Sequence, residues 1–219
     1  KASTGIVLPL LIFADIIGLD RLQAELPSGE SLALLNELAR QMDAAADDLG
    51  IERVVYASSA SVYGDPKKLP MHEDDELSPL TPYCIGKRTG EDLLGYYGRR
   101  SGLKWIALRF FNVYGEGQKM TAYYTSVINH FVERLKRGEA PVIDGEGKQS
   151  MDFIHVTDIA RAIVMSLESE KSNMPINVGT GIDTTVARLA EILIEAVGVD
   201  VKPEITVPDF TGLEASVED

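Results

Sequence analysis

The stretch RVVYASSAS, residues 53–61, decides the fold. Residues 53–57 form a short apolar run rich in β-branched side chains, which is typical of a strand buried on both faces of a parallel sheet. Ser58, Ser59 and Ser61 come directly after this run. Parallel α/β sheets place their ligand crevice at the carboxyl ends of the strands. We therefore expect these hydroxyl groups to lie at a binding site.

A helix that carries a tyrosine and a lysine is expected next along the chain. Thr81-Pro82 marks its start, and the helix is expected to run to about Arg100. Tyr83 and Lys87 are four residues apart, which puts them on one face of a helix. An ammonium group beside a phenol lowers the pKa of the phenol, so Tyr83 could transfer protons near neutral pH. The pair alone is a weak signal, because a chain with 8 tyrosines contains such pairs by chance, but its place after a serine-ended strand strengthens it.

Strand-like and helix-like segments alternate along the rest of the chain, which predicts a parallel, Rossmann-like α/β sheet. Helices are expected at residues 31–49, 125–137, 158–167 with Asp158 as the cap, and 184–197 with Asp183 or Thr184 as the cap. Further strands are expected at residues 104–113, 141–143 and 176–179. Periodicity does not distinguish strand from helix over residues 5–19, so the first thirty residues receive no assignment.

Composition limits the classes of function. A chain of 219 residues, 45% of them hydrophobic, can bury one domain, or a domain plus a small appendage. The net charge of −13 argues against a nucleic acid polymer as the partner. A single cysteine and three scattered histidines predict neither a disulfide nor a metal site, and favour a reducing, cytoplasmic location. Residues 6–19 are too short and too interrupted to span a bilayer, so no membrane partner is expected.

Five motifs, in order along the chain, resemble landmarks of one enzyme family. They are VVYASSASVYGD (54–65), SPLTPYCIGKRTGE (78–91), ALRFFNVYGEGQ (107–118), GKQSMDFIHVTDIARA (147–162) and INVGTG (176–181). Through them the chain resembles the NAD-dependent epimerase/dehydratases, which are extended short-chain dehydrogenase/reductases, and nucleotide-sugar 4-epimerases are nearest in wording. The resemblance implies NAD as the cofactor, a nucleotide-diphosphate sugar as the substrate, and a homodimer formed through helices near residues 31–49 and 83–100.

The resemblance also implies catalytic roles. Tyr83 would be the base that takes the proton of a sugar hydroxyl, and Ser59 would orient that hydroxyl. Lys87 would hold the nicotinamide ribose and lower the pKa of Tyr83. A hydride would pass from a sugar carbon to NAD and return to the other face of the resulting ketone, while the protein supplies position and proton transfer.

Binding roles follow in the same way. Phe111 falls where the family packs against nicotinamide, and Asn112 where a side chain meets the substrate diphosphate. Ser58, Ser59, Tyr83, Lys87 and Phe111 are thus the expected cofactor contacts, and Ser59, Ser61 and Asn112 the expected substrate contacts. Alternatives stay open, since Phe111 could be only a core residue, Asn112 a turn residue, and His155 a structural histidine.

The beginning of the chain departs from the family pattern. Residues 1–113 are expected to form an NAD-binding Rossmann-like domain that is incomplete on its N-terminal side. Residues 114–219 are expected to be mainly a substrate-binding region, with 152–180 returning to the sheet. No G-x-x-G-x-x-G or G-x-G-x-x-G motif precedes the serine strand, and only about fifty residues precede it, roughly half the family's usual number. We therefore expect this chain to bind NAD weakly or not at all.

Two further departures concern the chemistry. Ala60 and Ser61 stand where family members that eliminate water carry acidic residues, so epimerase or simple reductase chemistry is favoured over dehydration. Met151 stands where the family commonly has an arginine that grips the diphosphate. Two interpretations remain open: a nucleotide-sugar epimerase-type enzyme, or a catalytically impaired pseudoenzyme or assembly module of the same fold.

Overall fold

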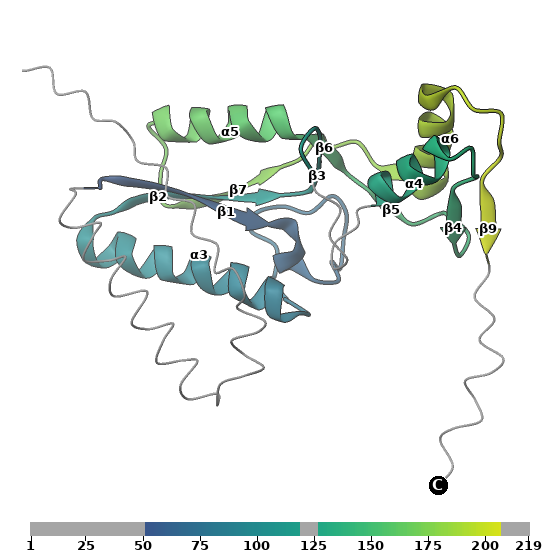
Figure 1. Ribbon diagram of the computed structural model, residues 1–219. Helices are drawn as coiled ribbons and strands as arrows, with labels where there is room; N and C mark the ends of the chain where they lie inside the picture. Colours follow the sequence, from purple (N-terminus) through teal and green to yellow (C-terminus); the bar gives the residue numbers. More distant parts are fainter. Residues whose placement is uncertain (1–50, 119–126, 207–219) are drawn as a thin grey trace, which may run out of the picture.

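The computed structural model describes residues 51–118 and 127–206. Its centre is a parallel sheet in the order β1-β2-β7, formed by β1 (Arg53–Ser59), β2 (Lys104–Phe110) and β7 (Met174–Val178). The helix α3 (Pro82–Ser101) covers one face of this sheet and α5 (Val156–Glu168) covers the other (Figure 1). This confirms the Rossmann-like parallel α/β arrangement that the sequence predicts.

The strand β1 presents alternate side chains to the two helices. On one face the Ser58 hydroxyl donates to Glu91 of α3, and Tyr56 packs against Gly90 of the same helix. On the other face Arg53 donates through Nη1 to the carbonyl of Ser166 in α5, at 3.2 Å. Since both faces are covered, the strand favours the apolar, β-branched residues seen between these polar anchors.

The helix α3 begins and ends where the sequence predicts. Thr81 caps its start, accepting a hydrogen bond from the N–H of Cys84 at 3.3 Å. Pro82 occupies the first turn, where the missing N–H costs nothing. Gly102 ends the helix in the left-handed conformation, with φ of 74°.

The chain leaves the central sheet at Phe111, so the single strand expected over residues 104–113 is wrong. β2 ends before this residue, and β3 (Asn112–Tyr114) pairs in parallel with β6 (Phe153–His155) instead. The Phe111 N–H still donates to the carbonyl of Val178, the last residue of β7, at 3.1 Å. An apolar run does not reveal such a change of partner, because the sequence KWIALRFFNV stays mostly apolar across it.

A second group of elements packs around its own core (Figure 1). Its helices are α4 (Val127–Lys136) and α6 (Val186–Val197), and its two-stranded sheets pair β4 (Val142–Asp144) with β9 (Glu204–Thr206) and β5 (Ser150–Met151) with β8 (Thr184–Thr185). Phe131 and Ile143 lie in this core, each 1% exposed. The predicted strand near residues 141–143 is confirmed as β4, with shifted ends. The predicted strand near residues 176–179 is confirmed as β7 of the central sheet, also with shifted ends.

The predicted caps of two helices are wrong. His155 rather than Asp158 caps α5, with Nδ1 accepting from the N–H of Thr157 at 3.3 Å. Thr185 caps α6 in place of Asp183 or Thr184, because Thr184 and Thr185 pair with β5 in an extended conformation and the helix begins only after them. In both cases the residue that ends a strand also caps the next helix.

The helix expected at residues 31–49 and the unassigned first thirty residues lie outside the described residues. Among residues 51–118 and 127–206, no helix combines the length and the apolar character needed to cross a membrane.

Candidate active site

The carboxyl end of β1 carries the serines. Ser59 is the last residue of β1 and caps the short 3-10 helix η1 (Ala60–Tyr63). Its hydroxyl oxygen accepts hydrogen bonds from the N–H of Ser61 at 3.2 Å and from the Ser61 hydroxyl at 2.8 Å. Neither bond uses the proton of Ser59, which is the proton that could be donated to a substrate oxygen.

Lys87 reaches from α3 to the same strand end. Its Nζ donates to the carbonyl of Ala57, two residues before Ser59, at 3.0 Å. The same nitrogen lies 5.5 Å from the centre of the Tyr83 ring, within cation–π distance. Tyr83 is 50% exposed, so a ligand can reach its ring. The structure thus gathers Tyr83, Lys87 and residues 59–61, which we call the serine loop, at the carboxyl edge of the sheet.

A second tyrosine, Tyr56 of β1, lies close to the same ammonium group. The Nζ of Lys87 lies 5.6 Å from the centre of the Tyr56 ring. Burial, together with the negative charges of Glu91 and of ionised Tyr83, raises the pKa of Tyr56 to about 12. Tyr56 therefore stays a neutral phenol near physiological pH. The sequence offers no motif that singles it out from the buried strand.

A buried ion pair joins α3 to β2 beneath the site. Arg109 is 3% exposed and Glu91 7%, and the guanidinium donates to the carboxylate through Nε at 3.0 Å and Nη2 at 2.7 Å. The Ser58 hydroxyl donates to the same carboxylate at 2.5 Å. Ser58, an expected cofactor contact, thus directs its hydroxyl into the core and away from the sheet edge.

The ion pair extends toward β7. Nη1 of Arg109 donates to the Tyr63 hydroxyl at 2.8 Å and to the carbonyl of Glu73 at 3.0 Å, and the Tyr63 hydroxyl donates to Asn177 at 2.7 Å. Burial alone would lower the pKa of Arg109, but hydrogen bonds to Glu91 and Tyr63 raise it overall, so the side chain stays charged. Sequence reasoning missed this network. The one signal for it in the sequence is Arg109 within the apolar strand KWIALRF, because a buried arginine requires a partner.

Phe111 and Asn112 lie where the chain passes from β2 to β3. Phe111 is half-buried and contacts Gly179, where an added methyl group would meet its ring at 3.2 Å. Asn112 is exposed, and its side-chain amide donates to the carbonyl of Asp152 at 3.1 Å. Phe111 follows Phe110, the register partner of Ser59, whereas Asn112 pairs with β6, and each has a local structural contact of its own.

Asp152 orders the loop that follows β7. Its carboxylate accepts hydrogen bonds from the Thr180 N–H at 2.9 Å, the Thr180 hydroxyl at 2.6 Å and the Gly181 N–H at 2.8 Å. His155 lies nearby and has structural contacts, since it caps α5 and meets the Tyr114 ring edge-on at 5.2 Å.

Cys84 lies buried under the start of α3. Its sulfur lies 2.9 Å from the Thr81 hydroxyl. Burial acts to raise the pKa of the thiol, but hydrogen bonds with Ser61 and Thr81 outweigh burial and lower it. The thiol thus links the helix cap to the serine loop.

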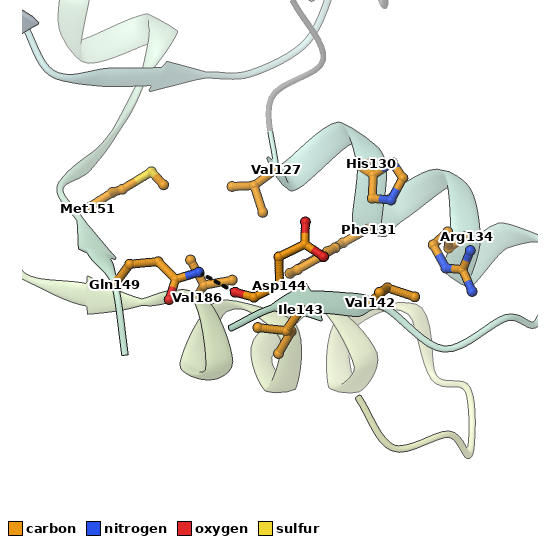
Figure 2. A pocket seen from close by; sticks show the side chains of 10 residues that line it. All are labelled: Val127, His130, Phe131, Arg134, Val142, Ile143, Asp144, Gln149, Met151 and Val186. Atoms are coloured by element: carbon orange, nitrogen blue, oxygen red, sulfur yellow. Dashed lines mark hydrogen bonds between the residues drawn. The ribbon is translucent and has the colours of Figure 1, made fainter. Parts of the chain in front are cut away.

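A hollow of about 560 Å³ lies in the second group of elements (Figure 2). Its lining comes from α4, from β4 and β5, and from the start of α6: Val127, His130, Phe131, Arg134, Val142, Ile143, Asp144, Gln149, Met151 and Val186. Met151 lies at one end of the hollow and Arg134 at the other (Figure 2). The Nε of Arg134 donates to the carbonyl of Ala140 at 2.6 Å. Six of the ten lining residues are apolar, and His130, Arg134, Asp144 and Gln149 are polar or charged.

This fold and this cluster of side chains define a Rossmann-like protein of the extended short-chain dehydrogenase/reductase type. Residues 34–179 match the NAD dependent epimerase/dehydratase family. The chain belongs to this family, whose members include NAD-dependent epimerases and dehydratases.

Relatives and solved structures agree with this assignment. The chain is 38% identical over 149 residues to a putative UDP-glucose 4-epimerase of Methanocaldococcus jannaschii, covering 68% of this chain and 48% of that protein. It is 34% identical over 173 residues to a UDP-glucose 4-epimerase of Mycolicibacterium smegmatis, covering 78% and 55%. It is similar in structure to the UDP-N-acetylglucosamine 4-epimerase of Methanobrevibacter ruminantium in complex with UDP-N-acetylmuramic acid, with a TM-score of 0.75, 32% identity, and coverage of 90% and 62%. The Thermus thermophilus UDP-glucose 4-epimerase complex with NAD gives a TM-score of 0.64 at 31% identity, covering 74% and 53%. The chain spans about half the length of the curated relatives it matches.

Proposed function

We propose that this chain carries the proton-transfer half of an NAD-dependent nucleotide-sugar epimerase. The observation that carries the proposal is the position of the Lys87 ammonium, which is bound to the carbonyl of Ala57 and lies 5.5 Å from the Tyr83 ring. A fixed positive charge beside a phenol favours the phenolate, which is the form that accepts a proton. Relatives named as UDP-sugar 4-epimerases support the substrate class.

Each residue of the cluster has a distinct part in this proposal. Tyr83 takes the proton of the sugar hydroxyl as the carbon loses its hydride, and returns it when the ketone is reduced on the other face. Ser59 donates its proton to the same sugar oxygen and so fixes its direction. Lys87 stabilises the Tyr83 phenolate throughout. NAD, when bound, supplies the acceptor for the hydride and gives it back.

The residues at the sheet edge fit a dinucleotide only in part. Lys87, which reaches from α3 to the end of β1, and Phe111, which follows β2, would hold a nicotinamide riboside, while Ser58 could contribute only through its backbone because its hydroxyl donates to Glu91. The pyrophosphate cradle has no counterpart among the sequence motifs before residue 53. We therefore propose that residues 1–113 form a partial NAD-binding domain and that the affinity of this chain for NAD is low.

The nucleotide end of the substrate would lie over the second group of elements, within our proposed substrate-binding region of residues 114–219. We propose Asn112 and Ser61 as further substrate contacts, and the apolar side chains of the hollow near Met151 would offer a surface for a base. Because Met151 carries no charge, the end of the hollow beside it would hold a ring more readily than a diphosphate, while Arg134 lies at the other end.

A homodimer through α3 is part of the proposal. Ile85 and Leu93 of this helix are 52% and 45% exposed, and a second apolar surface would cover them. The other expected helix, at residues 31–49, lies outside the described residues. Multi-angle light scattering is expected to give twice the chain mass, and a monomer at high concentration would contradict this.

The test of function combines NAD binding with turnover of UDP-glucose and UDP-galactose. In NAD at millimolar concentration we expect slow epimerisation that Tyr83→Phe lowers by roughly 10²–10⁴-fold without changing NAD binding. Tyr96→Phe is the matched control, since Tyr96 is an exposed tyrosine near the other end of the same helix. An unchanged rate in Tyr83→Phe would overturn the role of Tyr83 as base.

A second candidate function is a catalytically impaired pseudoenzyme or an assembly module that keeps the fold without turnover, which the Ser58 hydroxyl favours because it donates to Glu91 in the core instead of facing a cofactor. Neither NAD binding nor turnover in the wild-type chain would support this candidate. Firm retention of NAD through purification would oppose it.

A further inference from the structure

Two tyrosine rings lie close to the Lys87 ammonium. Tyr83, one helical turn before Lys87 in α3, has its ring centre 5.5 Å from Nζ, and Tyr56, from β1, has its ring centre 5.6 Å from it. Both distances are those of favourable cation–π contacts. With the bond from Nζ to the carbonyl of Ala57, these contacts hold the end of a side chain that would otherwise rotate about several single bonds.

Tyr56 is itself firmly held. It lies on the face of β1 that packs against α3, and its phenol rests on the backbone of Gly90. A methyl group at position 90 would overlap the hydroxyl of Tyr56, so only glycine leaves room for the ring. The ring is thus a fixed surface, in contrast to Tyr83, which is half exposed.

We propose that Tyr56 is a positioning residue that holds the Lys87 ammonium against Tyr83. The inference rests on the proposed function, in which Lys87 stabilises the Tyr83 phenolate. Without the Tyr56 ring, Lys87 would keep its charge but visit positions further from Tyr83, and its electrostatic effect there would fall with distance.

The ionisable groups around Lys87 leave Tyr83 as the phenol that it acts upon. Burial raises the pKa of Tyr56 to about 12, so this phenol remains neutral at physiological pH. The Glu91 carboxylate is bound by Arg109 from β2, and their charges compensate each other. Tyr63 of η1 is hydrogen-bonded to Arg109, and its pKa is raised, chiefly by burial. Cys84 lies on the side of the helix cap, bound to Thr81.

The experiment measures the pKa of Tyr83 directly, in the 219-residue chain and without cofactor. Tyrosine labelled with ¹³C at the ring carbon that bears the hydroxyl gives one NMR signal per tyrosine, and Tyr83→Phe assigns the signal of Tyr83. We expect Tyr56→Leu to raise the pKa of Tyr83 by roughly half a unit, the size of one cation–π contact. Tyr56→Phe keeps the ring and is expected to shift it by less than about 0.2 units.

Lys87→Met separates this inference from the proposed function. If Lys87→Met raises the pKa of Tyr83 and Tyr56→Leu does not, the positioning role is overturned while the Tyr83–Lys87 pair stands. If neither variant raises it, both fail. Fluorescence of Trp105, the single tryptophan, checks that each variant is folded. Tyr56→Met removes the ring in the same way should the leucine variant not fold.

Discussion

The buried pair of Glu91 and Arg109 allows a quantitative prediction. Glu91→Leu removes a carboxylate that accepts two hydrogen bonds from Arg109 and one from Ser58. Arg109 is 3% exposed and would keep only its bonds to Tyr63 and to the carbonyl of Glu73. Breaking a buried pair by removing one partner costs about 3–5 kcal/mol, because the remaining charge stays desolvated and uncompensated. We expect a loss in this range, a large part of the roughly 5–15 kcal/mol of stability typical of a domain.

A double-mutant cycle tests the cause of this loss. Replacing both members by Glu91→Leu and Arg109→Met leaves no buried charge, so the double variant should recover most of the stability that Glu91→Leu loses. The free energy of unfolding would be measured by urea titration, with the fluorescence of Trp105 as the signal. This side chain is 9% exposed and packs against Gly98 of α3, so it reports on the same helix.

Asp92→Asn is the matched control for this cycle. Asp92 pairs with Arg88 on the exposed side of α3, with a side chain 63% exposed, so its loss should change stability by no more than about 0.5 kcal/mol. A loss below about 1 kcal/mol in Glu91→Leu, or simple additivity in the double variant, would refute the view that the buried charge dominates.

Three further predictions concern α3 and its neighbours. Gly90→Ala should destabilise the chain by about 1–3 kcal/mol because its methyl group overlaps Tyr56, whereas Gly86→Ala, with open space around it, should stabilise by up to about 1 kcal/mol; urea titration of both checks this. The fold raises the pKa of Tyr56 from its ordinary value of 10.0 to about 12. The contribution of the neutral phenol to the free energy of unfolding should therefore be fully present below pH 10 and should fall by about 1–2 kcal/mol between pH 10 and 12. Unfolding of Tyr56→Phe, measured over the same pH range, should lack this part of the fall. Cys84 is 6% exposed, so its reaction with a thiol reagent should follow unfolding; fast labelling in the absence of urea would contradict its burial.

Local signals in the sequence predict the elements well where the elements depend on local chemistry. Thr81-Pro82 and Gly102 define α3 because a cap, a ring without an N–H and a left-handed glycine act within one turn. The same rules fail at His155 and Thr185, where a strand residue forms the cap. Whether a strand ends at that point depends on its pairing with another segment, which a local pattern does not contain.

The candidate site divides in a similar way. The spacing of Tyr83 and Lys87 predicts that they share one face of a helix, and in the structure Nζ of Lys87 lies beside the Tyr83 ring. Their roles in catalysis remain predictions. Glu91, Arg109 and Tyr56 act through contacts between elements that are distant in the chain. An arginine in an apolar strand signals a buried partner, but nothing in the sequence says which carboxylate it finds.

The two halves of the proposed chemistry separate along the chain. The residues that would move a proton are held by contacts within residues 53–109: the bond from Lys87 to Ala57, the ring of Tyr56, and the pair of Glu91 with Arg109. The group that would move a hydride needs a pyrophosphate cradle that none of these contacts supplies. Lys87 can therefore lower the pKa of Tyr83, as the proposed base requires, even where NAD binds poorly. If turnover is slow, a lowered pKa of Tyr83 combined with low NAD affinity would place the cause in the cofactor site alone. An unshifted pKa of Tyr83 would place the cause in the proton-transfer pair itself.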